Sequence, residues 1–264
     1  MKLFDQHIHT KYSPDSTAEI GDYLEIAAIK GREYFVCTDH VDFGCVCFSN
    51  DTIPDFKARE REFQSFRKKY PNIQILNGVE IGFRADYERE ILNIIEDNNF
   101  DIVLLSVHDN GVIDFYWPEG LKKYGLLKAM NDSLDITLKA VETISNYNVL
   151  AHIDFTFKSL YLIDNSYTFK MFEEKLIKIL KRVISSGKSL EINTRVQSFL
   201  PESHTHYLLD LYKSLGGTKL TVSSDAHSKE RYEADFDKYI SIIKQHGFTQ
   251  LRVYVRGKEH IAEI

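Results

Sequence analysis

Six of the ten histidines in this sequence lie at the ends of short apolar segments, the kind of segment that forms a buried strand. The first segment carries two of them, His7 and His9, with one residue between them. In an extended strand, side chains two positions apart point to the same face, so both imidazoles can bind one metal ion. The other four end separate segments: His40, His108, His152 and His227. This distribution points to metal chemistry.

Two carboxylates end segments of the same kind. Glu80 follows the apolar residues 75–79, and Asp225 follows residues 220–224, two positions before His227. Imidazole and carboxylate together suit divalent metals such as Zn, Mn or Fe, and the sequence offers no thiolate-rich set. Glu80 is the natural bridge between two ions, because it lies on the middle strand between the histidine groups. Bridged ions ~3.5–4 Å apart both generate hydroxide and hold a phosphoryl group.

A hydrogen-bonded structural role is the more common explanation for any single one of these histidines. That explanation must hold independently at six positions, all at the same end of a strand. We therefore interpret the chain as a multinuclear metal enzyme.

The segments that carry these residues alternate between strand and helix patterns. Strands are expected near residues 2–9, 34–40, 73–81, 102–108, 148–154, 189–194 and 219–225. Helices are expected near residues 17–31, 54–70, 85–98, 131–147, 168–187, 203–216 and 228–247. Seven strand–helix units in order predict an α/β fold with parallel strands. Because functional residues end nearly every strand, a barrel is favoured, since it gathers the carboxyl ends of its strands around one mouth.

Length and composition limit the other possibilities. The 264 residues, 43% of them hydrophobic, contain no linker or repeat, so we expect one globular domain over residues 1–264. The segment 251–255 is either an eighth strand or an edge piece. A net charge of −6 gives no general attraction to nucleic acid or to an anionic membrane, and we expect neither as a partner.

The expected compartment is the cytoplasm. No apolar run approaches the ~20 residues that a membrane span requires, and the first residues carry no apolar signal segment. The three cysteines, Cys37, Cys45 and Cys47, form neither a CxxC pair nor an even framework. We therefore expect three reduced thiols.

Taken together, the motifs resemble the polymerase-and-histidinol-phosphatase (PHP) superfamily, and they occur in the expected order from end to end of the chain. Within the superfamily, the length and the segment 190–194 (LEINT) resemble the stand-alone L-histidinol phosphate phosphatases. The motifs are His7-x-His9, Thr38-Asp39-His40, Gly78-Val79-Glu80, Ser106-x-His108, Ala151-His152-x-Asp154 and Ser224-Asp225-x-His227.

The resemblance implies a distorted (β/α)7 barrel with three divalent metal ions at the carboxyl ends of the strands. The first ion would take His7, His9, Glu80 and Asp225. The second would take Glu80, His108 and His152. The third would take Asp15, His40 and His227. Within residues 13–16, Asp15 can instead cap a helix.

The implied activity is hydrolysis of a phosphomonoester, most specifically of L-histidinol phosphate to L-histidinol and phosphate. Water activated by the metal ions would attack phosphorus, and Arg195 would help to neutralise the charge of the transition state. The catalytic set is then Glu80, Arg195, Asp225 and His227.

Several further residues are candidates for the surroundings of the site. Arg195 follows the sixth strand and offers a fork of donors to phosphate, and Arg59 is a second cation for it. Asp42 can meet the ammonium of an amino alcohol, and Phe43 is expected beside it, in an entrance formed by residues 41–54 and 115–117. Asp5 and Asp39 lie beside ligand histidines and are expected to orient imidazoles. Asp154, two residues beyond His152, either does the same or is only a turn residue.

Three alternatives differ from this prediction. Another PHP phosphoesterase, acting on nucleotides or oligonucleotide ends, would share every metal ligand, although the acidic net charge argues against it. An amidohydrolase-type barrel also begins with HxH, but it usually bridges its metals with a modified lysine, where this chain has Glu80. A non-enzymatic domain of the kind appended to polymerases predicts lost ligands or a fused neighbour.

Overall fold

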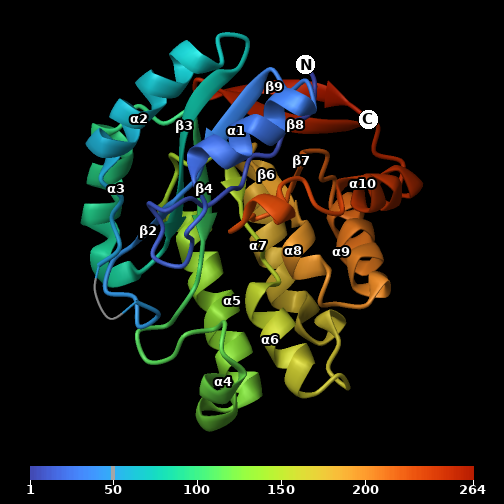
Figure 1. Ribbon diagram of the computed structural model, residues 1–264. Coiled ribbons are helices and arrows are strands. Elements are labelled where there is room, and N and C mark those ends of the chain that lie inside the picture. Colours follow the sequence, from blue (N-terminus) through green and yellow to red (C-terminus); the bar gives the residue numbers. More distant parts are fainter. Residues whose placement is uncertain (49–50) are drawn as a thin grey trace.

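The computed structural model describes residues 1–48 and 51–264, and its centre is a parallel seven-stranded sheet. The sheet curls into a half-barrel with helices around it (Figure 1). Residues 49–50 of the expected entrance loop lie outside the described residues. The strands are β1 (Tyr34–Cys37), β2 (His40–Asp42), β3 (Gln74–Gly82), β4 (Ile102–Ser106), β5 (Val149–Leu150), β6 (Ser189–Asn193) and β7 (Leu220–Ser223). The predicted α/β class with parallel strands is confirmed.

Strand order follows chain order, from β1 through β3, β4, β5 and β6 to β7, and β2 also pairs with β3. β1 pairs with residues 74–77 of β3, and β2 pairs with residues 80–82 of the same strand. The two are therefore halves of one interrupted strand, where the sequence predicted a single strand over 34–40. His40, the first residue of β2, follows the interruption and lies beside Glu80, its register partner on β3.

The predicted strand over residues 2–9 is replaced by an extended segment with a single bridge, between Ile8 and Ala226. It lies between β1 and β7: Thr38 N donates to Ile8 O (2.8 Å) on one side, and His9 N donates to Ala226 O (2.8 Å) on the other. A regular ladder does not form because side chains take the backbone donors. Thr38 Oγ1 accepts from Ile8 N at 2.9 Å, and Asp39 Oδ1 accepts from Thr10 N, two residues further on, at 2.7 Å.

A two-stranded antiparallel hairpin of β8 (Gln250–Val255) and β9 (Lys258–Glu263) lies beside the first residues of the chain (Figure 1). Segment 251–255 is thus a strand of this separate hairpin. The Gln6 side chain joins it to the N-terminal segment: Nε2 donates to Arg252 O at 3.0 Å, and Oε1 accepts from Tyr254 N at 2.7 Å. Apolar residues of the hairpin share a buried cluster with the sheet, which includes Phe4, Val36, Leu76, Leu104, Val149, Val253 and Val255.

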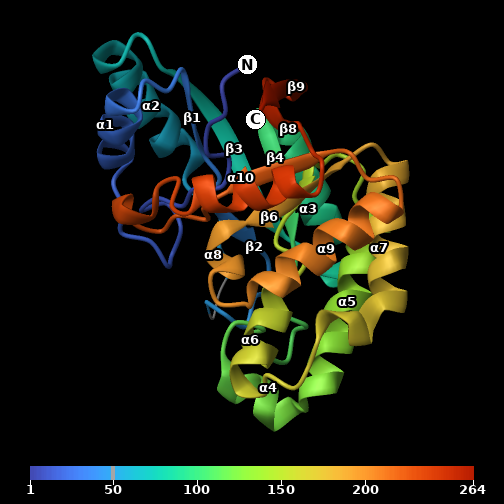
Figure 2. The same ribbon diagram turned by 90° about the vertical axis from the view of Figure 1, so that its right-hand side faces the viewer.

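Helices occur at all seven predicted places. Their bounds are α1 (Ile20–Ile29), α2 (Phe56–Lys69), α3 (Glu88–Asp97), α4 (Pro118–Tyr124), α5 (Leu126–Thr143), α6 (Phe155–Ile163), α7 (Glu173–Ser185), α8 (Thr194–Gln197), α9 (Glu202–Ser214) and α10 (Phe236–Gln245). Short 3-10 turns are η1 (Ala85–Tyr87), η2 (Phe169–Phe172) and η3 (Lys229–Arg231). Figure 2 shows α5, α7 and α9 together on one side of the molecule and α1 and α2 on the other. Among the described residues, no helix is long and apolar enough to cross a membrane.

Three helices were not predicted: α4, α6 and α8. The sequence of α6, FTFKSLYLI, is rich in aromatic and β-branched residues, which favour strands in isolation. Packing overrides this preference, because Phe157 and Leu160 enter the main core with residues of α7 and α9. α6 matters for function because it supplies one wall of the cavity described below.

The expectation of three reduced thiols is wrong for two of them. Cys45 and Cys47 form a disulfide, with their Cα atoms 5.2 Å apart. This distance lies within the usual range for such a bond. Cys37 is a buried free thiol.

Candidate active site

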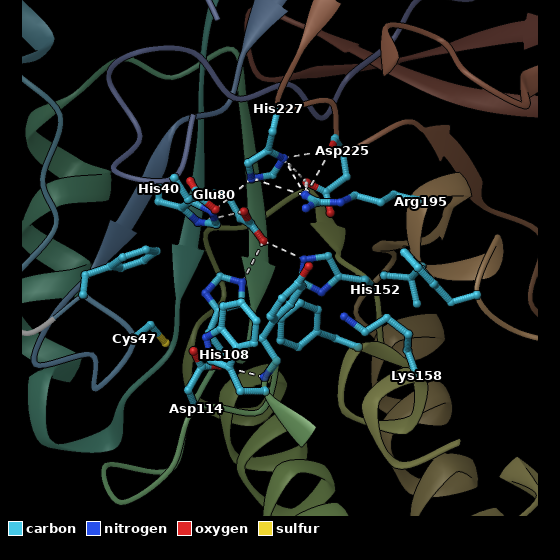
Figure 3. A pocket seen from close by; sticks show the side chains of 17 residues that line it. His40, Cys47, Glu80, His108, Asp114, His152, Lys158, Arg195, Asp225 and His227 are labelled. Carbon is cyan, nitrogen blue, oxygen red and sulfur yellow. Dashed lines mark hydrogen bonds and ion pairs between the residues drawn. The ribbon is translucent and has the colours of Figure 1, made fainter. Parts of the chain in front are cut away.

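The nine predicted metal ligands meet in one cluster at the carboxyl ends of the strands, with Glu80 of β3 at its centre. Figure 3 shows Glu80 among His40, His108 and His152. Glu80 Oε1 lies 3.1 Å from Nε2 of His108 and 2.7 Å from Nε2 of His152. Glu80 Oε2 lies 3.2 Å from Nε2 of His7, 3.3 Å from Nε2 of His9 and 3.0 Å from Nδ1 of His40. One buried carboxylate therefore contacts imidazoles from four parts of the chain, as a bridging ligand would.

The donor atoms form four overlapping groups, and within each group they lie no more than 4.8 Å apart. These groups are His7–His9–Glu80, His7–His152–Asp225, His40–Glu80–His108 and His9–Asp15–His40–His227. The set implied for the third ion, Asp15, His40 and His227, is present as one of these groups, which also contains His9. The helix-cap alternative for Asp15 does not hold, since Asp15 Oδ2 lies 2.9 Å from Nε2 of His227 and α1 begins only at Ile20.

The imidazole and carboxylate donors suit divalent metal ions, and two of their atoms lack a hydrogen-bond partner in the described part of the chain. Glu80 Oε2 and His40 Nδ1 lie 3.0 Å apart but are not aligned as a hydrogen bond, and neither buried atom has another hydrogen-bond partner among the described residues. Leaving such atoms without a partner is costly in a protein interior, and coordination of a cation would satisfy them.

The electrostatics of the cluster agree with this reading. Burial works to raise the pKa of Glu80, but His7, His40 and His108 hold it well below its usual value. Burial works to lower the pKa of His108, but Asp42 and Glu80 raise it to about 10. The pKa values of His7 and His40 are raised as well, so without a cation these three imidazoles keep protons that balance the carboxylates. Metal ions would displace those protons, because only a neutral imidazole nitrogen can coordinate.

Partners behind the ligands orient three of the imidazoles. Glu191 Oε1 lies 2.7 Å from Nδ1 of His7, and Asp42 Oδ1 lies 2.8 Å from Nδ1 of His108. Ser13 Oγ lies 3.0 Å from Nδ1 of His9. A hydrogen bond at Nδ1 leaves Nε2 with its lone pair free for a metal ion.

Two of these findings differ from the sequence-based assignments. Asp42, expected to meet a substrate ammonium, is buried and is occupied by His108. Glu191 of β6 was missed as a functional residue, although it lies inside the LEINT segment. The signal was its alternation with Leu190 and Ile192, which puts a carboxylate on the inner face of a buried strand.

Arg59 and Asp39 form a buried ion pair away from the cavity. Arg59 Nη1 donates to Asp39 Oδ2 at 2.7 Å, and Nη2 donates to Asn77 Oδ1 at 2.6 Å and to Gly78 O at 2.8 Å. Its side chain is 1% exposed, so it has no access to a substrate. Arg59 thus fastens α2 to β3, and the expectation that it contacts phosphate is not supported. Asp39 also fails to contact an imidazole directly, and reaches His9 only through Ser13.

The other two aspartates expected to orient imidazoles contact other groups. Asp5 accepts hydrogen bonds from Ser224 N at 3.0 Å and from Glu233 N at 3.1 Å, so it fastens the loop after β7. Asp154 accepts from Gln197 Nε2 and from His204 Nε2, the latter at 2.8 Å. Asp5 therefore does not orient an imidazole, and Asp154 has its alternative role, as a residue of the turn before α6.

A cavity of about 320 Å³ opens above the cluster. Five aromatic side chains line it: Phe48, Tyr116, Trp117, Phe155 and Phe199. Phe43 is absent from this lining, since it is buried and stacks on Tyr87 with ring centroids 5.8 Å apart. The expected aromatic entrance exists: Phe48 from the loop 41–54 and residues 116–117 contribute to it, and α6 and the segment after α8 add Phe155 and Phe199.

Two cations face the cavity, Arg195 of α8 and Lys158 of α6 (Figure 3). Arg195 Nη1 lies 3.6 Å from Asp225 Oδ1 and 2.6 Å from Nδ1 of His227, so it adjoins the metal ligands as predicted. Lys158 was not predicted. Its Nζ lies 3.8 Å from the centroid of the Tyr116 ring and 4.9 Å from that of Phe155, and no described residue forms an ion pair with it. The cavity therefore offers positive charge beside the cluster.

A curled parallel sheet with imidazoles and carboxylates gathered at its carboxyl end, under a cavity that holds two cations, defines a metal-dependent hydrolase. The sequence model of the PHP domain matches residues 5–195. The chain belongs to the PHP domain family, as its motifs predicted.

Known proteins resemble the chain over nearly its whole length. A curated histidinol-phosphatase from Lactococcus lactis subsp. lactis (strain IL1403) is 32% identical over 96% of this chain and 95% of the relative. A curated relative from Thermotoga maritima is 26% identical over 95% of both chains.

Solved structures share the fold. The crystal structure of histidinol phosphate phosphatase from Lactococcus lactis, complexed with zinc, L-histidinol and phosphate, matches with a TM-score of 0.83 and 27% identity. The match covers 98% of this chain and 99% of that one. A structure from Listeria monocytogenes matches with a TM-score of 0.72 and 18% identity, over 89% of this chain and 99% of the other, and it supports the fold alone.

Proposed function

We propose that this protein is a metal-dependent phosphomonoesterase that hydrolyses L-histidinol phosphate to L-histidinol and phosphate. The observation that carries the proposal is the Glu80-centred cluster on the floor of a cavity whose walls hold Arg195 and Lys158. Such a site combines metal ligands with fixed cations, which is what a phosphoryl group requires. The structural relative that binds zinc, L-histidinol and phosphate supports the choice of substrate.

The cofactors in this proposal are three divalent ions, Zn, Mn or Fe, held by the nine clustered ligands. When bound, such ions lower the pKa of a coordinated water and neutralise phosphoryl oxygens. Glu80 would contribute negative charge to their binding, and Glu191 and Asp42, bonded at Nδ1, would leave the Nε2 atoms of His7 and His108 available for coordination.

Arg195 and Lys158 are the residues that bind phosphate in this proposal. Burial works to lower the pKa of Arg195, but Asp225 raises it on balance, so the guanidinium stays charged and offers a fork of donors. Burial and the nearby Arg195 lower the pKa of Lys158 to about 8. Lys158 is therefore still mainly protonated at neutral pH, and a phosphate dianion between the two cations would offset their mutual repulsion.

The alcohol part of the substrate would lie against the aromatic wall. Tyr116, Trp117 and Phe155 offer ring faces and edges to an imidazole, and such aromatic contacts contribute about 0.5–1.5 kcal/mol each beyond burial. A cavity of about 320 Å³ suits a molecule of this size.

The remaining features of the proposal concern surroundings and partners. We place the enzyme in the cytoplasm, with a small-molecule substrate and no nucleic acid partner. The net charge of −6 supports the absence of a nucleic acid partner, because a polynucleotide requires a basic surface.

A phosphate-release assay over a panel of phosphomonoesters tests the function, with the metal content measured on the same sample. L-histidinol phosphate should exceed p-nitrophenyl phosphate and simple sugar phosphates in kcat/KM by at least about a hundredfold, roughly 2.7 kcal/mol. The metal content should approach three ions per chain. Similar values across the panel, or a preference for dinucleotides, would replace this proposal with a general phosphoesterase acting on nucleotides or oligonucleotide ends.

A further inference from the structure

One carboxylate in the cavity has no part in the metal cluster. Of the four acidic residues that line the cavity, Asp15, Glu80 and Asp225 each contact imidazoles of the cluster. Asp114 is the fourth, and its carboxylate has one hydrogen bond, accepted by Oδ1 from Tyr116 N at 2.7 Å. Within residues 1–48 and 51–264, no cation forms an ion pair with it. The cavity thus contains an anion with spare acceptor capacity.

The backbone around Asp114 is held firmly. The segment after β4 folds back on itself, with a bridge between Asp109 and Asp114, and Phe115 N donates to His108 O at 2.9 Å. Ser159 Oγ of α6 donates to Tyr116 O at 2.7 Å and fixes the far end of the segment. The position of the carboxylate is therefore set by the fold and not by a flexible loop.

Lys158 and Asp114 attract each other across the cavity, but the two charges form no ion pair within the described residues. Lys158 lies over aromatic rings, 3.8 Å from the centroid of Tyr116, and Asp114 instead uses the backbone of that residue. Burial raises the pKa of Asp114, so its charged form lacks part of the solvation that water would give. A ligand that carries a cation would restore that interaction.

Figure 3 shows Asp114 next to His108, at the opposite end of the cavity from Arg195 and His227. A ligand with phosphate at the Arg195 end therefore meets a negative group at the other end. In an amino-alcohol phosphate such as L-histidinol phosphate, the ammonium is on the carbon next to the ester-bearing carbon. The polarity of such a molecule matches that of the cavity.

We propose that Asp114 binds the ammonium group of the substrate and so makes the enzyme selective for phosphates of amino alcohols. This inference rests on the proposed function and supplies the role for which the sequence suggested Asp42. A carboxylate that loses its cationic partner in a partly buried site penalises substrates without the amine, which is how polar sites reject analogues.

The test compares two substrates on the metal-loaded enzyme: L-histidinol phosphate and its deamino analogue, 3-(imidazol-4-yl)propyl phosphate. Asp114→Asn removes the charge and keeps an oxygen for Tyr116 N, so the segment should hold its shape. The ratio of kcat/KM for the two substrates should fall about 10- to 100-fold in the variant, the usual effect of one charge-assisted hydrogen bond. Most of the change should be in KM for the amine substrate.

Asp97→Asn is the matched control, since it removes the same charge from the exposed surface of α3 and should leave the ratio unchanged. An unaltered ratio in Asp114→Asn would overturn the inference, whether activity is kept or falls equally for both substrates. As a measure independent of any variant, L-histidinol should inhibit the wild-type enzyme at a concentration at least about tenfold lower than its deamino analogue. Equal inhibition would also overturn the inference. Failure of the proposed function would appear earlier, as a wild-type enzyme with no preference for L-histidinol phosphate over p-nitrophenyl phosphate.

Discussion

Replacing Glu191 by Gln should weaken metal binding although Glu191 is not a predicted ligand. Its carboxylate accepts four hydrogen bonds: Oε1 from His7 Nδ1 (2.7 Å) and from Ser223 Oγ, and Oε2 from His152 N (2.8 Å) and from Asn193 Nδ2 (3.3 Å). A glutamine has the same shape but carries one NH2 group. In either orientation that NH2 faces a group that also donates.

Each orientation has a definite cost. If the NH2 faces His7, the imidazole must accept at Nδ1 and carry its proton on Nε2, where it blocks coordination. Loss of such an orienting partner typically costs 10–100-fold in metal affinity, about 1.4–2.8 kcal/mol. If the NH2 faces His152, a buried backbone N–H loses its acceptor, at about 1–3 kcal/mol of stability. For a chain of this length, that amounts to a fall in Tm of roughly 2–5 °C.

The assay is a titration of apoenzyme with Zn or Mn, followed by phosphate release and by the ions retained after dialysis. Ser223→Ala is the matched control, because it removes another hydrogen bond to Oε1 but leaves Glu191 to accept the proton on Nδ1 of His7. We expect Glu191→Gln to need at least about tenfold more metal for half-maximal activity. The reasoning is refuted if the variant binds metal as tightly as the wild type and melts at the same temperature.

Three further predictions concern the cluster and the two cations. Glu80→Gln should lower kcat by several orders of magnitude while circular dichroism stays normal, because the amide keeps the shape but not the charge between the ions; near wild-type turnover would show that Glu80 does not bridge. Arg195→Ala should weaken transition-state binding by about 1.5–3 kcal/mol, measured as a lower kcat/KM, while the metal content stays unchanged. Loss of metal would reveal a structural role. As pH rises through about 8, Lys158 loses its proton, so kcat/KM should fall. That fall should be absent in Lys158→Arg, and a fall that persists there would assign it to another group.

The cluster could be predicted from the sequence because each ligand is identified by its local position, at the end of an apolar segment. The pair His7 and His9 needs only the two-residue period of an extended chain, and the other ligands need only the rule that parallel strands end at one edge. The ladder of the first strand was not predictable, since Thr38 and Asp39 replace its backbone partners with side chains. The strand propensity of a sequence does not indicate where side chains will replace backbone hydrogen-bond partners.

The surroundings of the cluster could not be predicted, because they depend on the direction of single side chains. Glu191 meets His7 across 184 residues of chain, and Asp42 meets His108 across 66. Nothing in the sequence near Arg59 distinguishes a buried guanidinium from an exposed one. Lys158 lies on a helix whose composition favours a strand, so its side chain could not be aimed at the cavity before the fold was known.

The link between Gln6 and Tyr254 has a consequence for how the enzyme is made. The two residues are 248 positions apart, and at 5–20 residues per second a ribosome needs roughly 12 to 50 seconds to add the second after the first. During that time the segment with His7 and His9 has neither β7 nor the hairpin to lie against. We expect loading with metal to follow folding, and not to nucleate it as zinc does in small metal-dependent domains. A nascent chain released early would carry two histidines that can bind metal without ever forming the site.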